Sequence, residues 1–220
     1  MTARLRAAIN LGNPVLAKRG RDGALGGVSV DLARALARQS GQELELIAYD
    51  AAARVVEAAH AGAWDVAFLA IDPQRATEIA FTEPYLEIEG VFVVAGEAQW
   101  NSLEDLDRPG VRIAVGRGAA YDLHLSRVLA RAELVRAPTS AAALSWFFER
   151  GLEAAAGIRT AAETFAASRP GLRLIDPPFM TIRQAMAVPI AESAAVSSLQ
   201  AFLDQALAEE PVARALALIG

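Results

Sequence analysis

The sequence predicts an α/β fold of two lobes, each with a mostly parallel sheet flanked by helices. Short apolar runs alternate with longer segments that carry apolar residues at helical spacing. This strand–helix–strand order is typical of a parallel sheet with helices on its faces. The order starts again after residue 110, and 220 residues are enough for two small lobes.

Four strands and three helices are expected in the first half of the chain. The strands are expected at 5–11, 44–49, 64–70 and 90–96, and the helices at 26–41, at 51–63 and after Asp72-Pro73. Gly41 and Gly62 fall where helices commonly end, and Asp72 with Pro73 favours a helix start.

The second half repeats the alternation. We expect a short helix at 102–110, strands at 111–116, 133–137, 152–158, 172–179 and 184–189, and helices at 117–132, 140–151, 159–168 and 193–220, the last broken at Pro211. Lobe 1 is therefore predicted to comprise residues 1–90 and 186–220, and lobe 2 residues 91–185. A hinge of two strands would join them.

Composition excludes several classes of function. The net charge is −5 with both signs mixed along the chain, which argues against nucleic acid or an anionic membrane as a partner. The chain has no cysteine and two histidines, so neither a metal site nor another bound cofactor is expected. No run approaches the roughly 18 apolar residues of a membrane span.

The start of the chain bears on its location. In "MTARLRAAINLG" the first apolar run, residues 7–11, is short and contains Asn10, unlike a secretory leader. A cytoplasmic protein is expected from the chain as given, and a periplasmic one if a leader was removed.

Three segments carry a family resemblance: "GGVSVDLARALARQSG", with Asp31 at an acidic position, "AGAWDVAFLAIDPQRATEIAFTEPYL" and "SLEDLDRPGVRIAVGRGAAYDLHL". They resemble the first helix, the signature block and the opening of the second lobe of the family 3 extracellular solute-binding proteins. The resemblance implies the type II periplasmic binding fold, used for uptake of polar amino acids.

Arg75 is the leading candidate for ligand binding. The resemblance implies that this arginine binds the ligand's carboxylate from the first lobe. A guanidinium offers two parallel donors to a carboxylate, and Arg75 follows the end of a predicted parallel strand, where α/β sheets bind ligands. Amides near Ala70 and Asp72 would add donors. The alternative is a surface arginine paired with Glu78 or Glu83.

A glycine turn in the second lobe is the matching element. In "VGRGAAYDL", the resemblance implies that the backbone amides of Gly118, Ala119 and Ala120 donate to the same carboxylate, here without the threonine hydroxyl that the family often has. The segment lacks the GK[ST] of a phosphate loop. The alternative is an ordinary tight turn.

Departures from the family pattern point to an unusual ligand. Phe68 and Ala70 stand where the family has acceptors for the ligand's α-ammonium. Ile158 takes the place of an aspartate, and Arg159 follows it. A buried ammonium without an acceptor is strongly disfavoured, so we expect a carboxylate ligand without a free α-amino group: a dicarboxylate, a 2-oxo acid or an aromatic acid. The alternative for Arg159 is a solvated residue at a helix start.

Two further residues are candidates for ligand contact. Asn13 follows the first strand, where it either hydrogen-bonds a ligand or caps a turn. Gln184 lies near the predicted return to lobe 1 and contacts either the ligand or the hinge.

The favoured function is capture of a small carboxylate ligand by a monomeric solute-binding protein, with an ABC permease as the partner that the resemblance implies. Two alternatives stay open. One is a cytoplasmic, dehydratase-like enzyme on the same fold, with Glu153, Asp72 and Tyr121 as candidate acids or bases. The other is a soluble ligand sensor.

Overall fold

The computed structural model describes residues 3–209, 212 and 216. The chain divides into two compact units. Unit 1 comprises residues 1–86 and 183–220, and unit 2 comprises residues 87–182. The lobe boundaries expected from the sequence, 90/91 and 185/186, lie four and three residues further along the chain.

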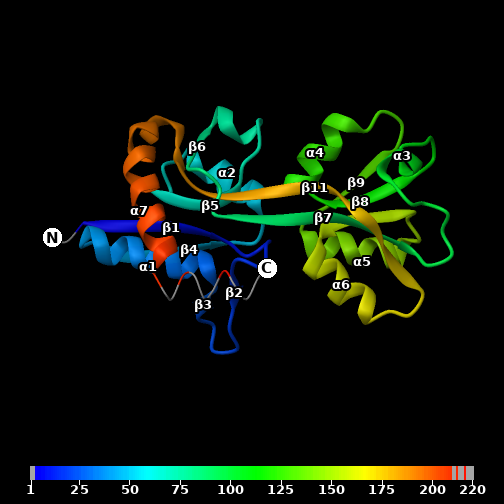
Figure 1. Ribbon diagram of the computed structural model, residues 1–220, viewed down its shortest axis with the longest axis horizontal. Coiled ribbons are helices and arrows are strands. Elements are labelled where there is room, and N and C mark those ends of the chain that lie inside the picture. The colour runs from blue at the N-terminus through cyan, green and yellow to red at the C-terminus, as the bar shows by residue number, and fades with distance from the viewer. Residues whose placement is uncertain (1–2, 210–211, 213–215, 217–220) are drawn as a thin grey trace. The chain divides into compact units, whose positions relative to one another are not determined.

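Unit 1 is built on three parallel strands with β1 in the middle (Figure 1). Its elements are β1 (Arg4–Asn10), β2 (Lys18–Arg19), β3 (Leu25–Gly26), α1 (Val28–Ser40), β4 (Glu43–Tyr49), α2 (Ala52–Ala59), β5 (Val66–Ala70), the 3-10 helix η1 (Arg75–Thr77), β6 (Ile79–Phe81), the 3-10 helix η2 (Ile190–Ala195) and α7 (Val196–Ala208). The strand order is β4-β1-β5-β11, where β11 is the long strand Leu172–Pro189, and β6 lies beside β11. β11 runs antiparallel to β5 and β6.

Helices cover both faces of this sheet, and strand β5 (Val66–Ala70) is apolar throughout. All five residues of β5 are buried. Phe68 packs on one side with residues of α1 and α7, among them Leu32 and Phe202. Leu69 packs on the other side with Trp64 and residues of α2. Because both faces of β5 are buried, its sequence is a continuous apolar run.

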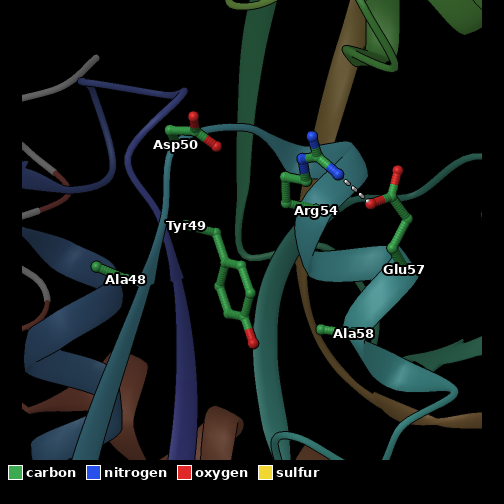
Figure 2. A pocket seen from close by; sticks show the side chains of 6 residues that line it. All are labelled: Ala48, Tyr49, Asp50, Arg54, Glu57 and Ala58. Atoms are coloured by element: carbon green, nitrogen blue, oxygen red, sulfur yellow. Dashed lines mark hydrogen bonds and ion pairs between the residues drawn. The ribbon is translucent and has the colours of Figure 1, made fainter.

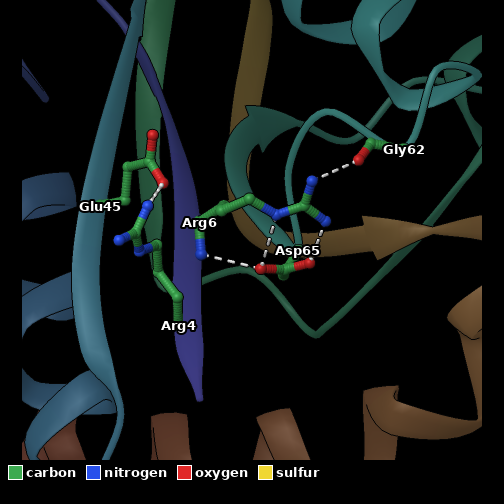
Figure 3. A network of polar contacts seen from close by, with 5 residues as sticks. All are labelled: Arg4, Arg6, Glu45, Gly62 and Asp65. Carbon is green, nitrogen blue, oxygen red and sulfur yellow. Dashed lines mark hydrogen bonds and ion pairs between the residues drawn. The ribbon is translucent and has the colours of Figure 1, made fainter. Parts of the chain in front are cut away.

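An arginine and an aspartate connect the amino ends of β1 and β5 (Figure 3). The backbone N–H of Arg6 donates to Asp65 Oδ2 at 2.7 Å, and its guanidinium donates to Asp65 Oδ1 at 2.6 Å. The backbone N–H of Asp65 donates to the carbonyl of Arg6 at 2.8 Å. Since the guanidinium stabilises the charged carboxylate, the pKa of Asp65 is lowered despite partial burial.

Unit 2 has the strand order β7-β10-β8-β9, with β8 parallel to β9 and β10 (Figure 1). Its elements are β7 (Leu86–Ala95), α3 (Leu103–Leu106), β8 (Arg112–Gly116), α4 (Ala120–Val128), β9 (Glu133–Ala137), α5 (Ser140–Arg150), β10 (Ala154–Ile158), α6 (Arg159–Ala167) and most of β11 (Leu172–Pro189). β7 begins at the last residue of unit 1's first segment, and β11 continues into unit 1.

Helices α1, α5 and α6 begin and end within two residues of the predicted bounds, whereas α2, α3 and α4 each end four residues earlier than predicted. Gly41 ends α1 and Gly151 ends α5, both in the left-handed conformation that glycine adopts at low cost. The hydroxyl of Thr139 accepts the N–H of Ala142 and so caps α5. Within the described part of the chain, no helix combines the length and apolarity needed to cross a bilayer.

Three expectations about elements are wrong. Asp72-Pro73 opens no α-helix: only the short 3-10 helix η1 forms, because β6 starts at Ile79 and pairs with β11. The two strands expected at 172–179 and 184–189 are one strand, β11. α4 begins at residue 120 rather than 117. The expected break at Pro211 lies outside the described residues.

Candidate functional site

Arg75 is a buried cation at the carboxyl end of β5. Arg75 is 3% exposed, and its Nη1 donates to the carbonyl of Ala70 at 2.9 Å. Ala70 is the last residue of β5, which lies parallel to β1 and β4. The surface alternative for Arg75 is wrong, because Arg75 is buried and Glu78 contacts His60 Nε2 at 2.7 Å.

Burial makes the charge of Arg75 costly. Loss of water lowers the pKa of Arg75 to about 10, while the nearby Asp72 carboxylate acts in the opposite direction. The guanidinium therefore stays protonated at neutral pH. In this environment of low dielectric, its attraction to an anion is stronger than it would be in water.

Two further candidates lie at the same end of β5. Asp72 is buried, and its Oδ1 accepts the N–H of Gln74 at 2.8 Å. Gln184 is buried in β11 directly opposite Ala70. The structure thus brings Arg75, Ala70, Asp72 and Gln184 together.

The other two candidates of unit 1 have local roles. Asn13 is buried after β1, and its side-chain oxygen accepts the N–H of Val15 at 3.2 Å, so it caps a turn. Phe68 is part of the hydrophobic core. As expected, neither Phe68 nor Ala70 brings a polar side chain to the end of β5.

A pocket lies at the carboxyl end of β4 and against α2 (Figure 2). It has a volume of about 580 Å³ and is lined by Ala48, Tyr49, Asp50, Arg54, Glu57 and Ala58. Arg54 and Glu57 form an exposed ion pair at 2.8 Å on its rim. Sequence reasoning missed this pocket, although a tyrosine and an aspartate at the end of a parallel strand are a signal for one.

In unit 2, the glycine turn before α4 already holds a carboxylate. Gly118 adopts a φ of 67°, and its N–H donates to Asp122 Oδ2 at 2.8 Å. The N–H of Ala119 donates to the carbonyl of Gly116 at 3.0 Å. Ala120 is the first residue of α4. Of the three backbone amides predicted to donate to the ligand, those of Gly118, Ala119 and Ala120, the amide of Ala120 is the one in the first turn of the helix.

Arg159, at the end of β10, is held by carboxylates. Its guanidinium pairs with Glu89 of β7, with Asp176 of β11 at 2.6 Å and with Glu163 at 3.6 Å. Hydrogen bonds to Asp176 and Glu89 raise the pKa of Arg159. Arg159 is the first residue of α6 and its side chain is 25% exposed, so it lies at a helix start as the alternative has it, but in contact with carboxylates.

Sequence reasoning missed the partners of these groups. Asp122 has a recognisable signal, because an acidic residue in the first turn of a helix often accepts backbone N–H groups. Glu89 and Asp176 are far from Arg159 in sequence, and no local pattern indicates that they meet it.

Two of the catalytic candidates are poorly suited to proton transfer. Glu153 accepts the backbone N–H of Arg112 at 2.8 Å and its guanidinium at 2.9 Å, and these bonds lower the pKa of Glu153. Burial raises the pKa of Tyr121 to about 12, so its phenol stays protonated at neutral pH. Neither group is tuned toward the neutral range that acid–base catalysis favours.

Comparison with known proteins decides the family. The model of the bacterial extracellular solute-binding proteins, family 3, matches residues 5–216. The chain belongs to this family. No curated protein matches this solute-binding protein significantly.

Solved structures of similar fold include amino acid-binding proteins. An ancestral arginine-binding protein bound to arginine is 22% identical, with 98% of this chain and 97% of that chain covered and a TM-score of 0.84. A putative ABC transporter binding component from Wolinella succinogenes DSM 1740, complexed with lysine, is 20% identical (98% and 94% covered, TM-score 0.82). The ancestral amino acid-binding protein AncCDT-1, a precursor of cyclohexadienyl dehydratase, is 20% identical (97% and 93% covered, TM-score 0.81). These similarities establish the two-lobed α/β fold for this solute-binding protein.

Proposed function

We propose that this protein captures a small carboxylic acid without a free α-amino group and delivers it to an ABC-type permease. The observation that carries the proposal is the buried guanidinium of Arg75, which donates to a neutral carbonyl at the carboxyl end of β5. A carboxylate bound there accepts two charge-assisted hydrogen bonds from a rigidly placed donor.

Two departures from the family pattern support the loss of an ammonium site. In unit 1, Phe68 and Ala70 bring no side-chain acceptor to the end of β5, and in unit 2 Ile158 stands in place of an aspartate. The neighbours described with arginine or lysine bound take ligands that carry an α-ammonium. A ligand ammonium placed here would lose its hydration at a cost of a few kcal/mol unless it met an acceptor, and the buried carboxylate at this position, Asp72, already accepts the N–H of Gln74 and lies near the guanidinium of Arg75.

Catalysis is the weaker alternative. AncCDT-1, a neighbour described as a precursor of cyclohexadienyl dehydratase, is itself described as an ancestral amino acid-binding protein. The carboxylate of Glu153 forms an ion pair with Arg112, and this contact gives it a structural role. We therefore propose binding without turnover, which NMR of a bound acid over many hours would verify.

A ligand panel tests the proposal directly. Thermal shift, followed by calorimetry, would compare standard L-amino acids with 2-oxo acids, dicarboxylates and aromatic acids. We expect the acids without an α-amino group to bind more tightly. An L-amino acid that binds more tightly than all of them would contradict the proposal.

Replacement of the central arginine sharpens the test. Arg75→Ala should weaken binding of the best acid by at least ~2 kcal/mol, because it removes one partner of a buried charge pair. Arg4→Ala is the matched control, since Arg4 belongs to an exposed pair with Glu45. Equal affinity in both variants would remove Arg75 from the site.

A further inference from the structure

We infer that the hairpin β2–β3 of unit 1 is a docking site for an acidic segment of a partner protein. We call residues 18–26 the basic hairpin, because they include Lys18, Arg19 and Arg21 and a single acidic residue, Asp22. Three positive side chains and one negative give this segment a charge of +2, whereas the whole chain carries −5. Docking at this surface goes beyond the proposed function and does not depend on the ligand.

The basic hairpin extends from unit 1 away from its sheet and is held in shape by its own hydrogen bonds (Figure 1). The N–H of Gly20 donates to the carbonyl of Ala24 at 2.7 Å, and the N–H of Ala24 donates to Asp22 Oδ1 at 3.1 Å. At the tip, Gly23 adopts a φ of 82°, a left-handed conformation that glycine adopts at low cost. Residues 18–24 are all exposed, so this shape does not serve to bury a core. A segment that is already ordered loses less conformational entropy when a partner binds it.

The cations of the basic hairpin are not neutralised by the described part of the chain. Among the described residues, no carboxylate forms an ion pair with Lys18, Arg19 or Arg21. Other exposed arginines of unit 1 are paired, as Arg54 is with Glu57 at 2.8 Å. Guanidinium and ammonium groups form charge-assisted hydrogen bonds with carboxylates. The hairpin therefore offers its charge to carboxylates of another molecule.

An acidic protein segment fits this surface better than an extended polyanion does. The net charge of −5 repels a nucleic acid or an anionic bilayer, which would face much of the molecule at once. Clusters that bind anionic lipids have roughly four to eight basic residues, and the basic hairpin has three. Residues 18–24 also contain no large apolar side chain to insert into a bilayer. A short segment with a few aspartates or glutamates contacts the hairpin alone and avoids the repulsion.

Binding of a labelled peptide of alternating glutamate and glycine tests the inference, with glutamine in place of glutamate in the control peptide. Fluorescence anisotropy with the full chain, at about 20 mM and about 150 mM salt, should show binding of the acidic peptide alone, weaker at the higher salt. Lys18→Gln combined with Arg21→Gln should weaken this binding at least about fivefold. Arg54→Gln combined with Arg108→Gln removes the same charge from exposed ion pairs and should leave the affinity unchanged.

The only lysine of the chain, Lys18, gives a second readout. A carbodiimide joins its amine to a carboxylate of the acidic peptide, and mass spectrometry locates the new amide bond. We expect the bond at Lys18. A bond found only at the terminal amine of the chain would overturn the inference.

Other outcomes would also overturn the inference. These are an acidic peptide that does not bind, and equal affinity in the two double variants. Binding to vesicles of phosphatidylserine and phosphatidylcholine in place of the peptide would assign the hairpin to a membrane. Self-association seen by sedimentation and lost in the hairpin variant, without peptide binding, would assign it to a second copy of the chain. In the described chain the side chains of Lys18 and Arg21 make no hydrogen bond, so their replacement leaves the hairpin's own bonds in place.

Discussion

The two units contain the same arginine–carboxylate contact at the amino ends of their sheets. In unit 1, Arg6 of β1 donates its backbone N–H and its guanidinium to Asp65, which precedes β5 (Figure 3). In unit 2, Arg112 of β8 does the same with Glu153, which precedes β10. In both, the acidic residue's N–H donates back to the arginine's carbonyl, at 2.8 and 3.1 Å.

The units differ at the opposite, carboxyl ends of these strands. Unit 1 places a buried arginine beside a neutral carbonyl, whereas unit 2 places Arg159 and the turn at Gly118 against its own carboxylates. The shared contact joins two neighbouring parallel strands in each unit, β1 and β5 in unit 1 and β8 and β10 in unit 2. It therefore has the same structural role in both units. The two units are therefore alike at the amino ends of these strands and different at the carboxyl ends.

The prediction with the largest expected effect concerns the residue that precedes the acidic residue of each contact. This residue is Trp64 in unit 1 and Leu152 in unit 2. Trp64 is 1% exposed, and its Nε1 donates to the carbonyl of Val55 at 2.9 Å. Trp64→Leu should lower the free energy of unfolding of unit 1 by about 3 kcal/mol, through lost packing and an unpaired carbonyl. Urea unfolding followed by circular dichroism measures it, with the half-buried Trp146→Leu as control. A loss below about 1 kcal/mol would show that a leucine serves equally well in either unit.

The next test removes the acidic charge from each pair. Asp65→Asn and Glu153→Gln should each cost about 1 kcal/mol, since the amide still accepts a hydrogen bond but attracts the guanidinium less. The effect should be larger for Glu153, whose side chain is 28% exposed against 38% for Asp65. Trp64 is the only tryptophan of unit 1, so with Trp100 and Trp146 of unit 2 replaced by Phe its fluorescence reports on unit 1 alone. Glu45→Gln, in an exposed pair, is the control, with less than about 0.5 kcal/mol expected.

Acidification should act on both pairs in the same direction. The pKa values of Asp65 and Glu153 are lowered by their arginines, so the stability they supply is present above their ordinary pKa values and is lost as pH falls through the lowered ones. Urea midpoints measured between pH 7 and pH 3 should fall less steeply in Asp65→Asn than in the unchanged protein. Parallel slopes would show that Asp65 contributes no pH dependence.

The order of strands and helices could be predicted from the sequence because apolar periodicity is a local signal. β6 and the short β2–β3 hairpin were missed, since segments of two or three residues have no period to detect. The helix expected after Asp72-Pro73 does not form, because pairing with β11, a strand distant in sequence, determines the structure of that segment.

The candidate site shows the same difference between features that have a local sequence signal and contacts between residues distant in sequence. Arg75 can be singled out from the sequence because it follows an apolar strand in a family pattern, and the structure places it in a buried position. Two of the three carboxylates around Arg159 come from positions 70 residues before it and 17 residues after it. Contacts of that kind depend on how strands are ordered in a sheet, and local sequence does not reveal the partner.

The late position of α7 in the chain has a consequence for biosynthesis. Leu199, Phe202 and Leu203 of α7 lie in the same core cluster as Ile9 of β1, so the core of unit 1 stays incomplete until the ribosome has made α7. Unit 2 is one continuous segment and can close its own core while synthesis continues. The nascent first segment of unit 1 thus exposes apolar surface the longest, and chaperones would be needed mainly there.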